Sequence, residues 1–253
     1  MERGRKAFGK SELEETFKQI GAKLRRPVMA YLIGGGAMCF RGQKLATKDL
    51  DLVFDSQDDF REFSLALKTC GYAESALLEK EYEEMKASGI WQNDEGFRFD
   101  LFVKTVCNAI SLSDNMVKRS KLLANYGNLA VYMVSDEDVI LFKGITERPD
   151  DADDIESIIR RADINWETIM RECREQSGTR VWYGLLYDKL AEIDSRGISV
   201  PILSQLLKLD NMAIIREAFE AQLRKGLGRK QARAYLMEKE FTKEEIDEAV
   251  GSD

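Results

Sequence analysis

Residues 31–54 read YLIGGGAMCFRGQKLATKDLDLVF, and this stretch decides the fold. Three consecutive glycines follow one apolar run, and two aspartates, Asp49 and Asp51, stand at the start of another. Residues 28–33 and 49–54 are short and apolar, so both predict strands. The two carboxylates need an explanation, because a buried strand favours apolar side chains at such positions.

Alternation along a strand places Asp49 and Asp51 on one face and the leucines between them on the other. Two ionised carboxylates this close repel each other unless a cation neutralises them, and oxygen ligands suit Mg²⁺. The segment FRFDLFV, residues 97–103, also predicts a strand and supplies a third acid, Asp100. If the two strands are neighbours, the three carboxylates form a site for two metal ions.

The glycines Gly34, Gly35 and Gly36 come directly after the first strand. Without a Cβ in the way, their backbone N–H groups can approach a phosphate. The spacing excludes a dinucleotide-binding fingerprint, because Cys39 stands where G-x-G-x-x-G requires its third glycine. A Walker A motif is excluded as well, because no G-K-[ST] follows.

Composition restricts the chemistry further. The 253 residues include no histidine, which excludes Ser-His-Asp and Cys-His catalysis and the H-E-x-x-H zinc site. Any reaction must use carboxylates, lysines, hydroxyls or a bound metal. The net charge of −7 argues against a protein that binds nucleic acid over its whole surface. The apolar runs are far shorter than the ~20 residues of a membrane span, so we expect a cytoplasmic protein without a membrane partner.

The remaining pattern predicts an α/β N-terminal part and a helical remainder. A first helix is expected over residues 11–24, with Ser11 and Glu14 in capping-box spacing, and a strand over residues 129–134. The helical period then dominates from Ser135 to the end. Helices are expected over residues 58–71, 135–147, 151–162, 165–173 and 179–194, and in three further segments after Gly197.

In combination these motifs resemble the polymerase-β-like nucleotidyltransferases. Ile33-Gly34-Gly35, thirteen intervening residues, DLD at 49–51 and FDL at 99–101 match that family's signature in order. Within the superfamily the chain is similar to the minimal and AbiEii-type branch, which includes many prokaryotic toxin and antitoxin components. The similarity rests on the TKDLDL sequence at 47–52 and on Lys143, Arg148, Asp151 and Asp154 in FKGITERPDDADDI. It covers residues ~28 to 160.

The resemblance implies an α+β fold, with a mixed β-sheet flanked by helices in residues 1–148 and an all-helical C-terminal annex in residues 149–253. It also implies transfer of NMP from an NTP, ATP among them, to an acceptor hydroxyl, with two Mg²⁺ or Mn²⁺ ions. Asp49 and Asp51 would hold the metals, and Asp100 would bind metal and orient or deprotonate the hydroxyl. The nucleotide would contact the amides of Gly34, Gly35 and Gly36 and the side chains of Thr47, Lys48 and Lys143.

Some alternatives stay open. Lys143 can instead be a solvated helix lysine. Gly35 stands where many active transferases have serine, which favours a catalytically degenerate binding or antitoxin module as the second interpretation. Residues 224–233 hold five basic residues and no acid, so this segment can bind RNA phosphates or dock a partner protein at the helical C-terminal region. The acceptor is left among RNA, a protein hydroxyl and a small molecule.

Overall fold

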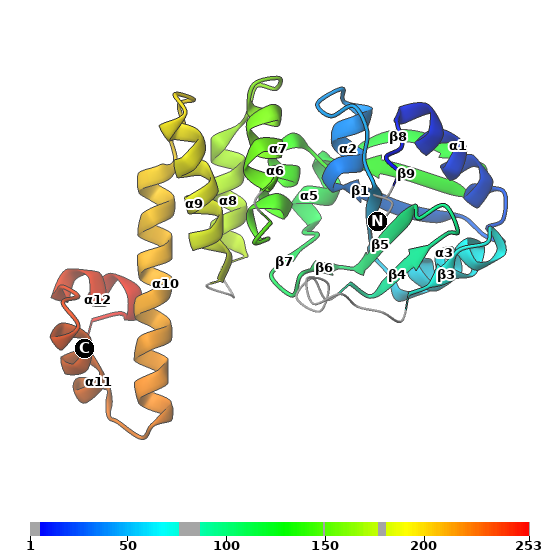
Figure 1. Ribbon diagram of the computed structural model, residues 1–253. Coiled ribbons are helices and arrows are strands. Elements are labelled where there is room, and N and C mark those ends of the chain that lie inside the picture. Colours follow the sequence, from blue (N-terminus) through cyan, green and yellow to red (C-terminus); the bar gives the residue numbers. More distant parts are fainter. Residues whose placement is uncertain (1–5, 76–86, 149, 177–180, 253) are drawn as a thin grey trace, which may run out of the picture. The chain divides into compact units, whose positions relative to one another are not determined.

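The computed structural model of the chain describes residues 6–75, 87–148, 150–176 and 181–252, and it contains two compact units, Met1–Asn165 and Trp166–Asp253. Figure 1 labels the elements. The helices of the first unit are α1 (Lys10–Gly21), α2 (Gly34–Phe40), α3 (Gln57–Thr69), α5 (Asp114–Arg119), α6 (Asp136–Gly144) and α7 (Asp150–Ile159). Its strands are β1 (Val28–Ile33), β2 (Asp49–Phe54), β3 (Ala73–Glu74), β4 (Gly89–Gln92), β5 (Arg98–Val103), β6 (Thr105–Val106), β7 (Ile110–Ser111), β8 (Lys121–Tyr126) and β9 (Leu129–Met133).

A seven-stranded mixed sheet organises the first unit, in the order β3-β4-β5-β2-β1-β9-β8. The pairs β2/β5 and β1/β9 are parallel, whereas β1/β2, β3/β4, β4/β5 and β8/β9 are antiparallel. The expected α+β fold with a mixed sheet is confirmed. Strands β1 and β2 have the predicted bounds, and β5 and β9 differ from prediction by one residue at one end.

The two faces of the sheet serve different purposes. Phe63 of α3 packs against Phe54 of β2 and Phe99 of β5, with ring centroids 5.1 and 5.8 Å apart. By strand alternation these phenylalanines lie on the face opposite Asp51 and Asp100. One face of the central strands is therefore filled by an aromatic core, and the other carries the acids.

The start of α1 differs from the sequence prediction. The helix begins at Lys10, and the backbone N–H of Gly9 donates to the Glu12 carboxylate at 2.9 Å. The expected pair of Ser11 and Glu14 therefore lies inside the first turn and does not form the cap. The side chains of Leu13, Phe17 and Ile20 are completely buried, as expected for one face of an amphipathic helix.

The unit boundary also differs from the expected division after residue 148. Helix α7 belongs with the first unit, which extends to Asn165. The physical reason is a pair of ionic contacts from Lys143 of α6 to Asp151 and Asp154 of α7, each at 2.7 Å. These charges are largely withdrawn from water, and separating them would leave buried ions without partners.

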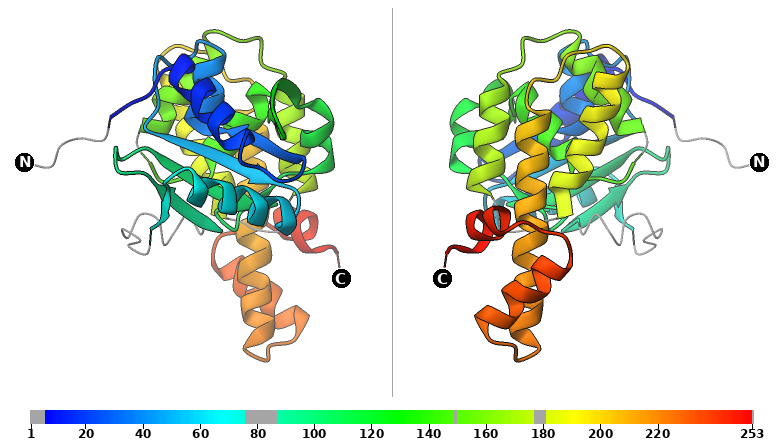
Figure 2. Two further views of the ribbon diagram at one scale, coloured as in Figure 1. Left: turned by 90° about the vertical axis from the view of Figure 1, so that its right-hand side faces the viewer. Right: turned by 90° about the vertical axis from the view of Figure 1, so that its left-hand side faces the viewer.

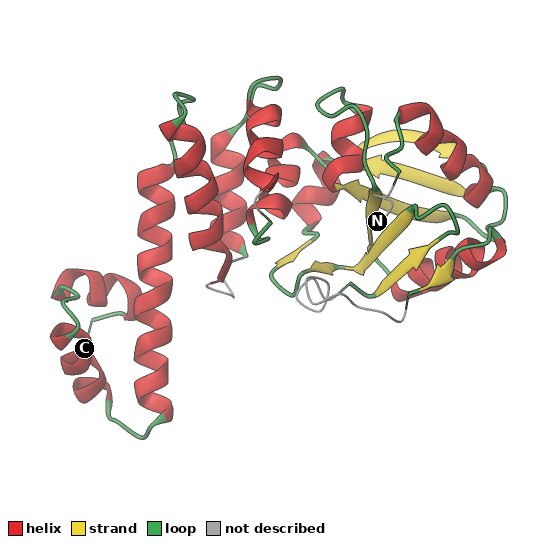
Figure 3. Ribbon diagram, in the orientation of Figure 1, coloured by secondary structure: helices red, strands yellow, loops and turns green. Residues whose placement is uncertain are grey.

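The second unit contains the helices α8 (Trp166–Glu175), α9 (Val181–Ser195), α10 (Leu203–Arg224), α11 (Arg229–Glu238) and α12 (Lys243–Val250), and no strand in its described residues (Figure 3). The expected helical annex is confirmed, although residues 179 and 180 of one predicted helix lie outside the described residues. Helices α11 and α12 pack on the C-terminal half of α10 around Phe219, Leu236 and Ile246 (Figure 2). In the described part of the chain, no helix combines the length and apolarity that crossing a bilayer requires.

Candidate active site

Strand register brings the predicted acids together. Asp51 of β2 lies directly beside Asp100 of β5, and Asp49 lies beside Arg98. All four residues are at matching positions of neighbouring parallel strands, so their side chains share one face of the sheet. Asp100 is completely buried, whereas Asp49 and Asp51 keep partial contact with solvent.

An arginine that the sequence analysis did not single out lies between two of these acids. One terminal nitrogen of Arg98, Nη2, donates to Asp49 Oδ2 at 3.0 Å and to Asp100 Oδ2 at 2.7 Å. The arginine itself is 5% exposed. The sequence FRFDLF does indicate this contact, because Arg98 and Asp100 are two residues apart on a strand and therefore share a face. Arg98 therefore supplies a buried positive charge that joins both strands at the site.

Two of the three carboxylates, Asp51 and Asp100, hold protons more tightly than ordinary aspartates do, because their pKa values are raised. Desolvation, together with the negative charges of Asp49 and Asp100, raises the pKa of Asp51 to about 8. Burial likewise raises the pKa of Asp100 to about 6, with the nearby Arg98 charge offsetting part of the increase. Burial is therefore the main reason why Asp51 and Asp100 favour their protonated forms, and the neighbouring acids add to it.

The glycine run forms the first turn of α2, directly after β1. Gly34 has φ +58°, and a Cβ added there would lie 2.2 Å from Asp51 Oδ2. An added Cβ on Gly35 would lie 2.6 Å from Thr47 Oγ1. The absence of these side chains lets the backbone approach the Asp51 carboxylate and the Thr47 hydroxyl closely. The start of the glycine turn and the Asp51 carboxylate are therefore neighbours in the structure.

Thr47 and Lys48 border the acid pair as expected from the sequence. Thr47 is buried, and its hydroxyl donates to the Asp49 carbonyl at 3.0 Å. Its backbone exchanges two hydrogen bonds with Phe8, at 2.8 and 3.0 Å. Lys48 is exposed. Thr47 is therefore a fixed point beside the glycine turn, while the Lys48 side chain reaches into solvent.

Lys143 is a buried lysine, so the alternative interpretation as a solvated helix lysine is wrong. Its ammonium donates to Asp151 Oδ1 and Asp154 Oδ2, each at 2.7 Å, and the residue is 8% exposed. Burial alone would lower its pKa, but the two carboxylates outweigh burial and raise the pKa of Lys143. Lys44, which the sequence analysis did not single out, donates to both oxygens of Asp154 at 2.9 and 2.8 Å. Two ammonium groups thus share one carboxylate.

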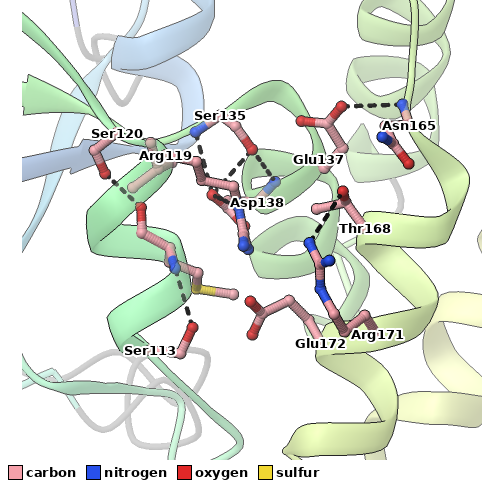
Figure 4. A network of polar contacts seen from close by, with 12 residues as sticks. Ser113, Arg119, Ser120, Ser135, Glu137, Asp138, Asn165, Thr168, Arg171 and Glu172 are labelled. Atoms are coloured by element: carbon pink, nitrogen blue, oxygen red, sulfur yellow. Dashed lines mark hydrogen bonds and ion pairs between the residues drawn. The ribbon is translucent and has the colours of Figure 1, made fainter.

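Helix α6, which carries Lys143, is fixed at its start by a second ion pair (Figure 4). Arg119 Nε donates to both carboxylate oxygens of Asp138 at 3.0 and 2.9 Å, and Asp138 is completely buried. Ser135 and Asp138 also cap the helix reciprocally. This network fixes the start of α6 and so helps to position the backbone that carries Lys143.

Arg148 lies in the electrostatic environment of the acids. Desolvation acts to lower its pKa, but the charges of Asp51, Asp49, Asp151 and Asp100 outweigh that effect, so the pKa of Arg148 is raised. The arginine of the FKGITERPDDADDI motif is therefore positioned to add positive charge to the site.

The donor chemistry of the acids fits a divalent cation. Asp100 Oδ1 is buried and accepts no hydrogen bond from the described residues. A buried carboxylate oxygen that accepts no hydrogen bond can instead coordinate a hard cation. Within the described ranges, however, no three acidic, cysteine or histidine side chains form a ready-made ligand cluster. The Arg98 guanidinium instead contacts two of the three carboxylates.

Some basic side chains of the segment 224–233 form contacts within the second unit. Arg233 is 7% exposed and forms an ion pair with Asp247. Arg229 donates to the Val250 carbonyl at 3.2 Å. Because these arginines hold the C-terminal helices together, the charge available to a nucleic-acid phosphate is smaller than the sequence suggests.

Comparisons with known proteins now give the family. The family profile described as "Nucleotidyltransferase of unknown function (DUF6036)" matches residues 11–189. Among solved structures, the crystal structure of the lincosamide antibiotic adenylyltransferase LnuA with bound lincomycin is similar at 18% sequence identity and a TM-score of 0.37, over 53% of this chain and 87% of that chain. No curated protein matches the chain. The profile spans most of the chain, and the chain therefore belongs to this nucleotidyltransferase family.

Proposed function

We propose that this protein moves a nucleotidyl group, NMP, from an NTP to an acceptor hydroxyl at the site of Asp49, Asp51 and Asp100. The observation that carries the proposal is the register of β2 and β5, which sets Asp51 beside Asp100 on the face that the glycine turn approaches. The acceptor is RNA, a protein hydroxyl or a small molecule. ATP as donor and a place in a toxin–antitoxin pair follow from the resemblance to AbiEii-type proteins.

In this proposal Asp49, Asp51 and Asp100 hold two Mg²⁺ or Mn²⁺ ions. When bound, the ions neutralise charge on the phosphates and make the acceptor hydroxyl easier to deprotonate. Two features support this assignment. Asp100 Oδ1 has no hydrogen-bond partner among the described residues, and burial together with the negative charges of Asp49 and Asp100 raises the pKa of Asp51 to about 8. Arg98 keeps Asp49 and Asp100 at a fixed separation by contacting both.

The nucleotide lies along the glycine turn. Backbone N–H groups of Gly34, Gly35 and Gly36 donate to triphosphate oxygens. No Cβ of Gly34 stands between the start of this turn and the Asp51 carboxylate. Thr47 and Lys48 border the phosphates on the β2 side. Lys143 contributes positive charge that acts on Asp51, while its ammonium remains paired with two carboxylates.

The transfer step follows from this arrangement. The acceptor oxygen attacks the α-phosphorus and forms a new P–O bond, while the bond from the α-phosphorus to the bridging oxygen of the β-phosphate breaks. Pyrophosphate leaves with that oxygen, and the hydroxyl proton passes to Asp100. Burial raises the pKa of Asp100, so this carboxylate accepts a proton more readily than an ordinary aspartate does.

The direct test incubates the protein with each of the four radiolabelled NTPs, Mg²⁺ and cell extract. Label should appear in one macromolecule or small molecule with the wild-type protein. Asp49→Asn and Asp51→Asn should each lower the labelling rate by more than 100-fold while circular dichroism shows a folded protein. Full labelling by both variants would refute the proposal.

A second candidate is a nucleotide-binding module that performs no transfer. Two observations favour it: Arg98 already neutralises part of the charge of Asp49 and Asp100, and Gly35 lacks the hydroxyl of a serine. This alternative predicts Mg²⁺-dependent NTP binding by calorimetry but no labelled product from any extract. Release of labelled pyrophosphate from a γ-labelled NTP would exclude it.

A further inference from the structure

The loop between α2 and β2, residues 41–48, is held firmly by its neighbours in the first unit. Gln43 Nε2 donates to Asp136 Oδ1 at 2.8 Å, and the Gln43 carbonyl accepts from Ser157 Oγ at 2.7 Å. At the other end Thr47 is bonded to Phe8 through its backbone. Lys44 lies between these two anchored residues, so its backbone position is fixed and its side chain extends from a defined point.

The side chain of Lys44 passes beside the glycine turn. Its Cδ lies 4.0 Å from the position that a Cβ on Gly35 would take, at van der Waals distance. Its ammonium continues to Asp154 of α7, where it donates to both carboxylate oxygens. Lys44 thus lies along the path on which the proposed function places the triphosphate.

The two lysines that contact Asp154 differ in exposure and in their number of carboxylate partners. Lys143 has a 10% exposed side chain and a second carboxylate partner, Asp151. The Lys44 side chain is 35% exposed, and Asp154 is the carboxylate that it contacts. If the Lys44 ammonium leaves, Asp154 keeps Lys143 at 2.7 Å, so no buried carboxylate loses its last counterion. The movable cation is therefore Lys44.

We propose that Lys44 binds the β- and γ-phosphates of the nucleotide, and that its ammonium exchanges Asp154 for these phosphates when the nucleotide arrives. The inference rests on the proposed function and deepens it by naming the cation that recognises the triphosphate. Phosphate oxygens carry more negative charge than one carboxylate, and a charge-assisted hydrogen bond to them is correspondingly strong. A nucleoside monophosphate lacks these groups and gains nothing from Lys44.

The test compares the affinity of the full-length protein for Mg²⁺-NTP and for the matching NMP by calorimetry. Lys44→Gln should weaken NTP binding about 10- to 100-fold and leave NMP binding within threefold of wild type. Lys44→Arg, which keeps the charge, should recover most of the NTP affinity. The matched control is Lys68→Gln, which removes an exposed lysine from α3 on the other face of the sheet and should change neither affinity.

The outcomes separate this inference from the proposed function. A wild-type protein that binds none of the four NTPs overturns both. A wild-type protein that binds an NTP, together with unchanged NTP affinity in Lys44→Gln, overturns the role of Lys44 alone. Equal losses for NTP and NMP also overturn it, because they would indicate a general structural effect. Thermal unfolding without nucleotide verifies that each variant folds.

Discussion

The substitution Gly34→Ala should have two effects, a loss of stability from backbone strain and a displacement of Asp51 in the proposed site. Gly34 has φ +58°, a conformation that costs an L-residue roughly 1–2 kcal/mol. For a unit of this size such a loss lowers the unfolding temperature by roughly 2–8 °C. The new Cβ would also lie 2.2 Å from Asp51 Oδ2. Non-bonded atoms need more than about 3 Å, so the carboxylate must move by about 1 Å.

The matched control is Gly71→Ala, after α3. Gly71 has φ +87°, and an added Cβ there meets nothing within 4 Å. Both variants carry a left-handed backbone penalty, but only Gly34→Ala displaces an acid of the proposed site. The clash involves the far end of a side chain, which rotates at little energetic cost. The two variants should therefore lose similar stability, while their nucleotide chemistry differs.

The assay measures thermal unfolding, Mg²⁺-NTP affinity and the rate of label transfer for both variants. A displacement of about 1 Å at a reacting group costs roughly 100-fold in rate, so Gly34→Ala should transfer label about 100 times more slowly than Gly71→Ala. Equal transfer rates in two folded variants would refute the argument that the glycine turn and Asp51 act together.

Three further predictions follow from the charges. Without metal, stability should fall as pH rises from about 4 to about 8, because Asp51, with its raised pKa of about 8, keeps its proton in the folded state after the unfolded chain has lost it. Urea unfolding in EDTA at several pH values should show this fall, and Asp51→Asn should flatten it. Arg98→Met should lower the free energy of unfolding by about 3–5 kcal/mol, since two carboxylates lose a buried counterion. Mg²⁺ should restore part of this loss if the acids bind the cation, and an unchanged urea midpoint would contradict the role of Arg98. Lys143→Met should also cost about 3–5 kcal/mol, because Asp151 loses the ammonium that it contacts, and calorimetric unfolding tests this.

Local sequence patterns were sufficient to predict the acid face of the sheet. The D-x-D of β2 and the FDL of β5 specify, through strand alternation alone, which side chains share a face. The structure adds the register that sets Asp51 beside Asp100. Strand β8 was not predicted, because its sequence KLLANY has no clear alternation and most of its residues are at least partly exposed.

The ion pairs of the site could not be predicted from one sequence. Lys44 and Asp154 are 110 residues apart in the chain, and nothing local to either residue indicates the other. Lys143 was expected to face phosphate or solvent, because a lysine on a helix gives no signal of a buried pair. The same contacts explain why α7 belongs to the first unit, although its acidic sequence resembles the start of a separate helical domain.

The most direct test of the account is anomalous diffraction from crystals containing Mn²⁺ and a non-hydrolysable NTP analogue. The account predicts manganese peaks within ligand distance of the Asp49, Asp51 and Asp100 carboxylates, with the triphosphate along the glycine turn. Manganese away from these carboxylates, or a nucleotide bound elsewhere on the protein, would contradict the proposed site.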